Sequence, residues 1–478
     1  MIGHPIPDLL ASRSRSTPDD EVLVIEGGRR YTASQLDTAV AYRAGAIAEQ
    51  LEGDHQRIGI STPSRHEALL DVLATIRAGG VATPVDPGLA RGDYLERIES
   101  GGLDGLIIDD DLADEIGVSE RDIARVQTTA SAAPIHERSF DPHSPCTMLF
   151  TSGTQGVPKS IVHTWWNHVA AAIASAKRLG VEPDDRWYDP LALYHMGGLA
   201  PISRCLVAGI PLVISRSVTA NRLLQRIDTA DASIASVVPT MVHAILETNG
   251  HTPDALRCLL VGGAPLRESL FDRARSRGIP IWSSYGLTET VGQVTTATPA
   301  ERSRHPGTVG TPLLGMSVRV VEGGEPCPPE RIGTIEITGE MVTPTAGDGD
   351  GGHTATLVTN DLGYRDAFGR LWVVGRVDDV IQTGGKLVHP FRIQQVLESH
   401  PGVSEAAVVG LPDDRWGELV SAAVIPSDVE VTIDELLDRC RQALPSHAIP
   451  RHIEHVDTLP RTPSGTVDRT ALRERLSR

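Results

Sequence analysis

The feature that most constrains the fold is a regular alternation of short apolar runs with longer amphipathic stretches, first at residues 36–108 and again at 211–262. The runs have the length of buried strands, and the stretches have the length and spacing of amphipathic helices. Strands are predicted at residues 57–60, 81–85, 106–108, 211–214, 233–238 and 259–262, and helices at 36–51, 66–78, 221–227 and 241–247. Because strands that alternate with helices form a largely parallel, helix-covered sheet, this region is predicted to be an α/β fold of layered sheets.

The pattern changes at residues 307–374, where glycine and proline become frequent and helical stretches disappear. Short strands at 317–321 and 334–337 predict a β-rich subdomain. Residues 346–352 have the sequence AGDGDGG, which predicts a loop.

The last hundred or so residues have an α/β pattern of their own and the size of a small separate domain. Helices are predicted at 391–399 and 433–444, and a strand at 406–409. The expected organisation is a large N-terminal domain (1–375), a hinge (376–378) and a small, mobile C-terminal α+β domain (379–478).

Charge and composition exclude several classes of function. The formal net charge of −18 argues against a nucleic-acid partner, because a phosphate backbone would be repelled. No apolar run approaches the roughly 18 residues of a membrane span, and the N-terminus lacks a signal-peptide core, so no membrane partner and a cytoplasmic location are expected. The five scattered cysteines support neither a disulfide framework nor a zinc site.

Residues 148–160, MLFTSGTQGVPKS, have the composition of a phosphate-binding loop. Glycines let backbone N–H groups approach phosphate oxygens, hydroxyls add donors, and Lys159 supplies a positive charge. A Walker A loop needs glycine directly before its lysine, and here Pro158 precedes Lys159, so the loop is of another type. Taken by itself, it is also compatible with an ordinary surface loop.

The loop resembles the signature of the adenylate-forming superfamily, which includes acyl-CoA synthetases, peptide-synthetase adenylation domains and luciferases. Further motifs of that family follow in order: LYHMGGL (193–199), GGAPL (262–266), SYGLTET (284–290), NDLG (360–363) and GRVDDVI (375–381). Residues 400–418 are similar to the C-terminal domain of an acyl-CoA ligase. The resemblance covers nearly the whole chain and implies ATP and Mg²⁺ as cofactors.

The resemblance also assigns roles to individual residues. It implies that the β- and γ-phosphates are held by Thr151, Ser152, Gly153, Thr154, Gly156 and Lys159. Tyr285 is expected to stack on adenine, with Gly263, Ala264 and Pro265 closing the other side, and Ser284 and Gly286 belong to the same nucleotide-binding set. Thr288 is expected near the α-phosphate, and Glu289 is expected to ligate Mg²⁺, a cation that prefers carboxylate oxygen. Glu289 as a surface acid is the alternative.

Three further residues belong to the nucleotide site and the hinge. Asp361 is expected to accept hydrogen bonds from both ribose hydroxyls, with an Asx turn before Gly363 as its structural alternative. Arg376 is expected to contact the ribose or the phosphates after closure, and Asp378 is the predicted hinge.

His195 and a tryptophan pair lie in two other motifs. The resemblance places His195 beside the substrate carboxylate or at the entry for the acceptor, and a packed core residue is the alternative. Trp165 and Trp166 follow the phosphate loop and are predicted to be packing residues, with lining of the substrate pocket as the alternative.

The chain departs from the family pattern in its C-terminal turn. Residues 459–469, LPRTPSGTVDR, match that turn except that Thr466 replaces its lysine, which in the family bridges the substrate carboxylate and the α-phosphate. Losing one preorganised charge donor costs about 3 kcal/mol of transition-state stabilisation. Only three lysines occur among 44 basic residues, and Lys386 in the loop 384–386 is a candidate for a compensating charge.

Three functions therefore remain open. The first is ATP-dependent activation of a small acyl or aryl carboxylic acid, with CoA, a carrier-protein thiol or an amine as the acceptor. The second is activation of nitrite with transfer to an amine, as some natural-product relatives are understood to do. The third is a catalytically degenerate nucleotide-binding protein.

Overall fold

The computed structural model describes residues 4–129, 132–151, 158–218, 222–248, 250–343, 355–461 and 467–477. The chain forms two compact units. The first contains Met1–Val318 and Ile337–Leu357, and the second contains Arg319–Glu336 and Val358–Arg478. The second unit thus begins earlier than the C-terminal domain expected at residue 379, while that domain and its hinge at 376–378 stay predictions.

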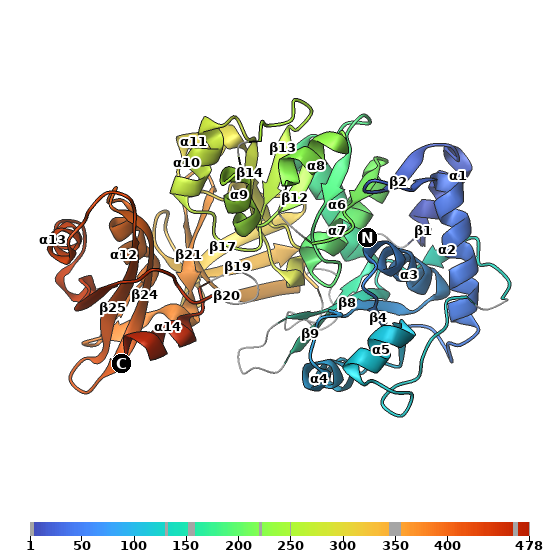
Figure 1. Cartoon of the computed structure of the whole chain (residues 1–478), viewed down its shortest axis with the longest axis horizontal. Coiled ribbons are helices and arrows are strands. Elements are labelled where there is room, and N and C mark those ends of the chain that lie inside the picture. Colours follow the sequence, from blue (N-terminus) through green and yellow to red (C-terminus); the bar gives the residue numbers. More distant parts are fainter. Residues whose placement is uncertain are drawn as a thin grey trace. The chain divides into compact units, whose positions relative to one another are not determined.

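The larger sheet of the first unit has a parallel centre with antiparallel strands at its edges (Figure 1). Its strand order is β16 (Thr311–Pro312), β15 (Thr295–Ala297), β14 (Ile281–Tyr285), β13 (Cys258–Val261), β12 (Ile234–Val237), β10 (Trp187–Asp189), β11 (Leu212–Ile214), β2 (Glu21–Ile25) and β3 (Arg30–Thr32). Strands from β14 through β2 are parallel neighbours, which confirms the layered α/β prediction.

The smaller sheet has the order β6 (Gly105–Ile108), β4 (Arg57–Ser61), β5 (Val81–Pro84), β8 (Pro145–Thr151) and β9 (Lys159–Thr164). Its first four strands are parallel, and β9 returns antiparallel to β8. A separate short pair joins β1 (Ile6–Pro7) to β7 (Ser139–Phe140). The hairpin of β8 and β9 carries the phosphate-loop motif.

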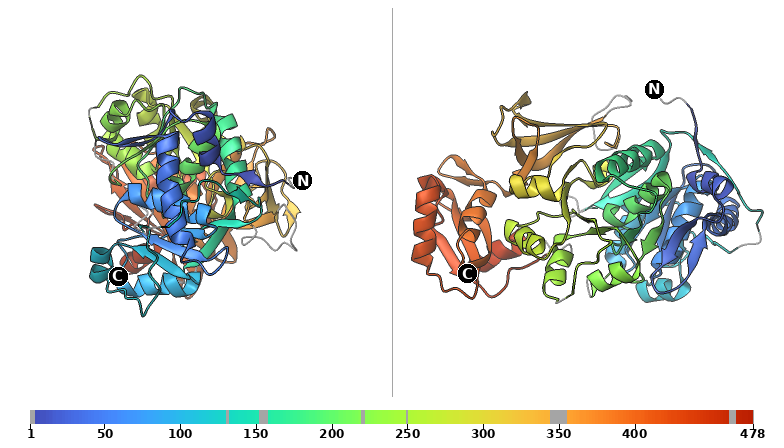
Figure 2. Two further views of the ribbon diagram at one scale, coloured as in Figure 1. Left: turned by 90° about the vertical axis from the view of Figure 1, so that its right-hand side faces the viewer. Right: turned by 90° about the horizontal axis from the view of Figure 1, so that it is seen from above.

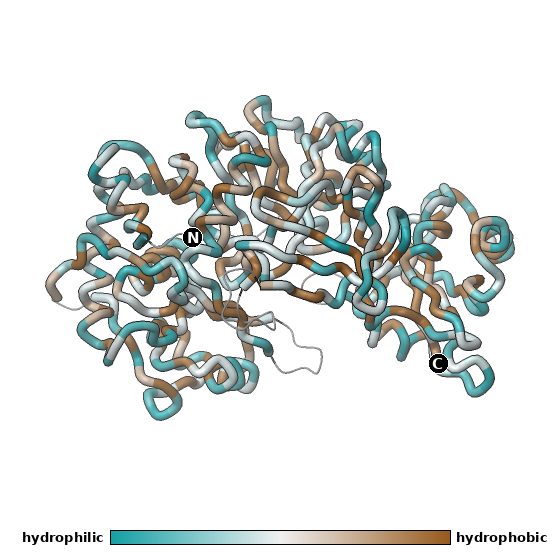
Figure 3. Tube along the Cα trace, turned by 180° about the vertical axis from the view of Figure 1, so that it is seen from behind, coloured by the Kyte–Doolittle hydropathy of each residue, from teal (hydrophilic) through white to brown (hydrophobic). Residues whose placement is uncertain are grey.

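Helices fill the space between the two sheets and cover their outer faces (Figure 2). One buried cluster joins strands of both sheets to α2 (Ala33–Ala48), α3 (Arg65–Ala78), α6 (Trp165–Leu179) and α7 (Met196–Ala208). A second lies against α8 (Leu223–Thr229), α9 (Pro239–Leu246) and α10 (Glu268–Ser276), and a third against α4 (Arg91–Gly101) and α5 (Asp110–Ile116). Hydrophobic and hydrophilic residues alternate along the tube in Figure 3, as expected where each element has one buried side.

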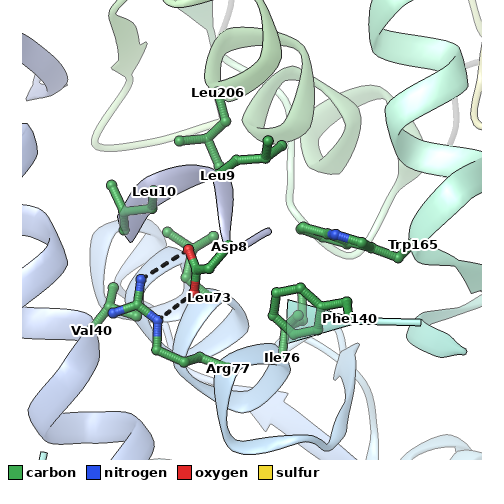
Figure 4. Close-up of a pocket in the computed structure, with 10 residues that line it drawn as sticks. All are labelled: Asp8, Leu9, Leu10, Val40, Leu73, Ile76, Arg77, Phe140, Trp165 and Leu206. Carbon is green, nitrogen blue, oxygen red and sulfur yellow. Dashed lines mark hydrogen bonds and ion pairs between the residues drawn. The ribbon is translucent and has the colours of Figure 1, made fainter. Parts of the chain in front are cut away.

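A buried ion pair fastens the N-terminal segment to this core (Figure 4). Asp8, at the start of α1 (Leu9–Ser16), accepts two hydrogen bonds from the Arg77 guanidinium, with N···O distances of 2.6 and 3.0 Å. The same guanidinium lies 2.7 Å from the Asp37 carboxylate. Trp165 packs nearby on Phe140, with ring centroids 4.9 Å apart, which agrees with its predicted packing role.

The predicted β-rich region forms a sheet in the order β18 (Glu325–Pro326), β17 (Met316–Glu322), β19 (Gly333–Gly339), β20 (Ala355–Arg365) and β21 (Leu371–Arg376). The boundary between the two units passes through β17 and β19 and within β20. The glycine-rich stretch 346–352 lies outside the described residues.

The C-terminal part is an α+β arrangement around a long hairpin of β24 (Val403–Asp413) and β25 (Gly417–Pro426). Its sheet also contains β22 (Ile381–Thr383), β23 (Lys386–Val388) and β26 (His452–His455). Alternate residues of β24 point to opposite faces, so Val408 packs with α12 (Pro390–Glu398) and α13 (Ile433–Ala443), and Val409 packs with α14 (Arg469–Leu476).

Candidate functional site

The β8–β9 hairpin places Thr151 opposite Lys159 at the base of the phosphate-loop motif. The Thr151 hydroxyl donates a hydrogen bond to the Lys159 carbonyl at 3.3 Å, and the Lys159 side chain is exposed. Ser152, Gly153, Thr154 and Gly156 lie outside the described residues, so their phosphate contacts remain predictions. The described ends of the hairpin leave Lys159 accessible to an anion.

The two adenine motifs meet at one edge of the larger sheet. GGAPL follows β13 and SYGLTET begins within β14, and these strands are parallel neighbours with Val261 beside Ser283. Gly263 adopts a left-handed φ of +78°, which turns the chain sharply after the strand. Gly263 and Pro265 are exposed, and Ala264, Ser284 and Tyr285 are half-buried. The carboxyl edge of a parallel sheet is where such folds bind ligands.

Gly286 is required by a close backbone approach. A Cβ atom on Gly286 would lie 2.4 Å from the Gly292 carbonyl carbon and 2.5 Å from the Gln293 nitrogen. No side chain fits at that distance, so the chain folds back directly on itself after Tyr285. This return places Thr288 and Glu289 in a short 3₁₀ turn, η1 (Thr288–Thr290).

Several hydrogen bonds hold this turn. The Glu289 carbonyl accepts a hydrogen bond from the Thr343 N–H at 2.9 Å. The Thr290 hydroxyl accepts one from the Leu287 N–H at 3.0 Å. Val291 closes the turn with a φ of +52°, a left-handed conformation that is unfavourable for a β-branched residue. Thr288 and Glu289 are half-buried, so their side chains remain available to a ligand.

A single carboxylate at this position is compatible with Mg²⁺. Mg²⁺ is usually held by one or two carboxylates together with water and substrate phosphates, rather than by a cage of protein ligands. The described residues contain no cluster of three histidine, cysteine or acidic side chains placed to hold a metal ion. Glu289 alone therefore fits a cation that arrives with a nucleotide.

Sequence reasoning missed two buried histidines beneath this turn. His163 of β9 is hydrogen-bonded through Nε2 to the Thr288 carbonyl at 2.8 Å, and its Nδ1 lies 3.3 Å from the Thr147 hydroxyl. His168 of α6 is hydrogen-bonded through Nε2 to the same hydroxyl at 2.8 Å. Desolvation lowers the pKa of His163 to about 4 and that of His168 to about 3. The available signal was two histidines just after the phosphate lysine, one on a strand and one on a helix.

His195 lies at the N-terminus of α7 with an exposed side chain. Its ring packs edge-on against Tyr194, with centroids 4.7 Å apart. Desolvation lowers the pKa of His195, and the Asp86 carboxylate opposes this shift. The exposed side chain speaks against the alternative of a packed core histidine, and the role of His195 beside the substrate stays a prediction.

In the second unit, Asp361 and Arg376 are direct partners across the antiparallel pair β20–β21. The Asp361 N–H donates to the Thr359 hydroxyl at 3.1 Å. Asp378 lies two residues beyond Arg376 in η3 (Val377–Asp379), and its carboxylate accepts a hydrogen bond from the Asn360 amide. The strand pairing thus brings the ribose motif and the predicted hinge together within this unit.

Lys386 follows the tip of the β22–β23 hairpin. Gly384 and Gly385 have φ values of +56° and +74°, the two left-handed residues of a tight hairpin turn. The Gly384 N–H donates to the Trp416 carbonyl at 2.8 Å, which fixes the turn on the sheet and leaves the Lys386 side chain exposed. Thr466 lies outside the described residues.

Comparison with known proteins agrees with this arrangement. Residues 10–345 match the AMP-binding enzyme family, and residues 392–466 match the AMP-binding enzyme C-terminal domain. The chain belongs to the AMP-binding enzyme family. It is an adenylate-forming ligase, as the ordered motifs predicted.

The similar proteins include 2-succinylbenzoate–CoA ligases of Bacillus. The ligase of Bacillus velezensis is 31% identical over 98% of both chains, and that of Bacillus subtilis is 30% identical over 98% of both.

Similar solved structures include Bacillus subtilis O-succinylbenzoate coenzyme A synthetase (MenE) in complex with ATP and a magnesium ion. It is 29% identical, covers 99% of this chain and 100% of that one, and has a TM-score of 0.86. ATP-bound MatB from Rhodopseudomonas palustris is 25% identical over 98% of both chains, with a TM-score of 0.88. The ligands of these structures agree with the predicted cofactors. Among the described residues of this chain, no helix combines the length and apolar character needed to cross a bilayer.

Proposed function

We propose that this protein uses ATP and Mg²⁺ to convert a small carboxylic acid, acyl or aryl, into its adenylate, releasing pyrophosphate, and then transfers the acyl group to CoA. The observation that carries the proposal is the meeting of the phosphate-loop strand and the Thr288–Glu289 turn through the hydrogen bond from His163. His163 and Thr288 lie 125 residues apart in sequence. The first segment supplies a positive charge for the phosphates, on Lys159, and the second supplies a carboxylate for Mg²⁺, on Glu289.

The chemistry requires that an acid oxygen attack the α-phosphorus of ATP while pyrophosphate leaves. Negative charge builds up on the phosphates, so the protein contributes mainly position and charge. In the proposal Lys159 neutralises the distal phosphates, Thr288 donates to the α-phosphate, and Glu289 holds the cation. Tyr285 stacks on adenine above Gly263, and the acid lies beside His195.

Asp361 and Arg376 complete the proposed nucleotide site. Their position as cross-strand partners on β20 and β21 supports a proposal in which Asp361 accepts hydrogen bonds from the ribose diol and Arg376 contacts the ribose or the phosphates. Rotation about Asp378 would present first the turn containing Thr466 and then the loop containing Lys386. The second orientation serves transfer to CoA.

The acid is best sought first among aryl and succinyl acids. The similar ligases from Bacillus act on 2-succinylbenzoate, so that compound is the first substrate to test. A carrier-protein thiol and an amine are the other acceptors to compare with CoA.

The deciding experiment is a pyrophosphate-release screen across carboxylic acids, with and without CoA. Release that depends on one acid, followed by formation of its thioester, supports the proposal. ATP binding without pyrophosphate release from any acid would instead indicate a nucleotide-binding protein without turnover.

A second candidate is favoured by one observation, the threonine at position 466 where the family turn has lysine. A small anion such as nitrite does not need the lysine contact that holds a substrate carboxylate. Nitrite with an amine acceptor therefore belongs in the same screen. Thr466→Lys separates the two functions. With a carboxylic acid it should raise the adenylation rate about tenfold or more, and with nitrite it should give no gain.

A further inference from the structure

We propose that His163 is a positioning residue that holds the Thr288–Glu289 turn against the phosphate-loop hairpin through one directed N–H···O bond. The inference rests on the proposed function, which assigns binding of the α-phosphate and of Mg²⁺ to that turn. It adds a residue that none of the family motifs contains.

The partners of the two histidines determine where each proton lies. A carbonyl oxygen only accepts, so the hydrogen bond to Thr288 requires a proton on Nε2 of His163. Both rings are buried, at 0% and 3% exposure, and the cationic Arg204 lies near His168, so both rings are neutral. Nδ1 of His163 is then an acceptor.

The rest of the chain of hydrogen bonds follows from this tautomer. The Thr147 hydroxyl donates to Nδ1 of His163 at 3.3 Å, and its oxygen accepts the Nε2 proton of His168 at 2.8 Å. The order runs from α6 through β8 and β9 to the Thr288 carbonyl. Each member is fixed by the next, so His163 has one orientation and one tautomer.

The receiving turn depends on outside support. The Thr288 carbonyl also accepts the Val291 N–H at 3.2 Å, and Val291 is fully buried in a left-handed conformation that its branched Cβ disfavours. An isolated turn of this kind would relax toward an ordinary conformation. His163 on one side and the Thr343 N–H on the other oppose that relaxation and fix the backbone of Glu289.

Loss of the His163 donor should displace Glu289 and Thr288 relative to Lys159. Catalysis by positioning is sensitive to shifts of about 1 Å, which cost roughly a hundredfold in rate. We therefore expect a fall in kcat of about tenfold to a hundredfold and a higher Mg²⁺ concentration for half-maximal activity. The KM for the acid should change little, because the proposed function assigns the acid to the vicinity of His195 and not to this turn.

Two substitutions of His163 distinguish the effect of losing the N–H donor from the effect of losing the imidazole ring. The Nε2 of glutamine lies as many bonds from Cα as the Nε2 of histidine, so His163→Gln keeps the donor to Thr288. The amide of asparagine corresponds to Nδ1, so His163→Asn keeps the side facing Thr147 and loses that donor. His168→Asn is the matched control, because it disturbs the same buried chain without contacting Thr288.

The expected result is near-parental turnover for His163→Gln and His168→Asn, within about threefold, and the large kcat loss only for His163→Asn. Calorimetric titration with a non-hydrolysable ATP analogue, with and without Mg²⁺, should show that His163→Asn loses the Mg²⁺-dependent part of the affinity. Equal impairment of His163→Gln and His163→Asn, or of His163→Asn and His168→Asn, would overturn the proposal.

A measurement on the parent protein keeps the proposal testable if a variant does not fold. Nitrogen NMR of histidine-labelled protein should show His163 as the neutral Nε2–H tautomer, and an Nδ1–H tautomer or an imidazolium at pH 7 would contradict the positioning role. Failure of the proposed function has a different signature. In that case the parent releases no pyrophosphate with any acid or with nitrite, while the tautomer and the Mg²⁺-dependent affinity are as described.

Discussion

Replacing Asp8 with alanine should destabilise the first unit through a defined set of lost contacts. The Asp8 side chain is 8% exposed and accepts two hydrogen bonds from Arg77, whose side chain is 2% exposed. It also accepts the Ala11 N–H at 3.0 Å and so caps α1. The substitution therefore removes a buried ion pair and a helix cap together.

The magnitude follows from these contacts. Breaking a buried ion pair costs about 3–5 kcal/mol, and the lower end applies because Asp37 still faces Arg77 at 2.7 Å. Loss of the cap adds about 1 kcal/mol. The sum is about 4 kcal/mol. For a unit of roughly 340 residues the entropy of unfolding is about 0.7 kcal/mol/K, so the thermal transition should fall by roughly 6 °C.

Differential scanning calorimetry measures the shift, and two variants test its cause. Asp8→Asn keeps the cap acceptor and one bond to the guanidinium, so it should lose about half as much. Asp8→Ala combined with Arg77→Met removes both partners of the Asp8–Arg77 pair, a loss that each single change already includes, so the double variant should recover about 2 kcal/mol relative to the sum of the single changes. A shift below about 1 °C for Asp8→Ala, or strict additivity in the double variant, would refute the reasoning.

The remaining predictions concern the pH dependence of stability and the second unit. His168 is buried and neutral with a pKa of about 3, near His163 and Arg204, whereas the unfolded side chain titrates near pH 6.5. The unfolded state therefore binds more protons than the folded state below pH 6.5, so the free energy of unfolding should fall as the pH falls, by about 2 kcal/mol at pH 5 from this residue. Denaturant titrations at several pH values should show a weaker dependence of that free energy on pH in His168→Gln. An unchanged pH dependence would contradict a buried, neutral His168. Asp361→Ala should weaken ATP binding by about 1.5–3 kcal/mol in calorimetry, and an unchanged affinity would make Asp361 structural. Asp378→Pro fixes φ and removes a backbone donor, so it should impair adenylation and thioester formation unequally, and equal losses would count against the hinge. Lys386→Ala should abolish adenylation if this lysine replaces the charge missing at Thr466, and a parental rate would exclude that compensation.

Periodicity along the chain was sufficient to predict the strands and helices that were named at 36–108 and 211–262, such as α2, α3 and β12, but not where each one begins. Capping decides the boundaries. The helix predicted at 36–51 begins at Ala33, because the Thr32 hydroxyl accepts the Gln35 N–H at 3.3 Å and the Gln35 side chain accepts the Thr32 N–H at 3.1 Å. A strand predicted at 406–409 extends over Val403–Asp413, because its pairing with β25 continues into residues whose sequence alone does not predict a strand.

The site shows the same division between local and tertiary information. Motifs such as GGAPL and SYGLTET are local, because their glycines meet backbone requirements that the sequence displays, as Gly286 does against Gly292. His163, His168 and Thr147 carry no such local signal. Their role arises only when β8, β9 and α6 pack beneath a turn more than a hundred residues away, because burial in that packing sets their protonation and gives each nitrogen a partner.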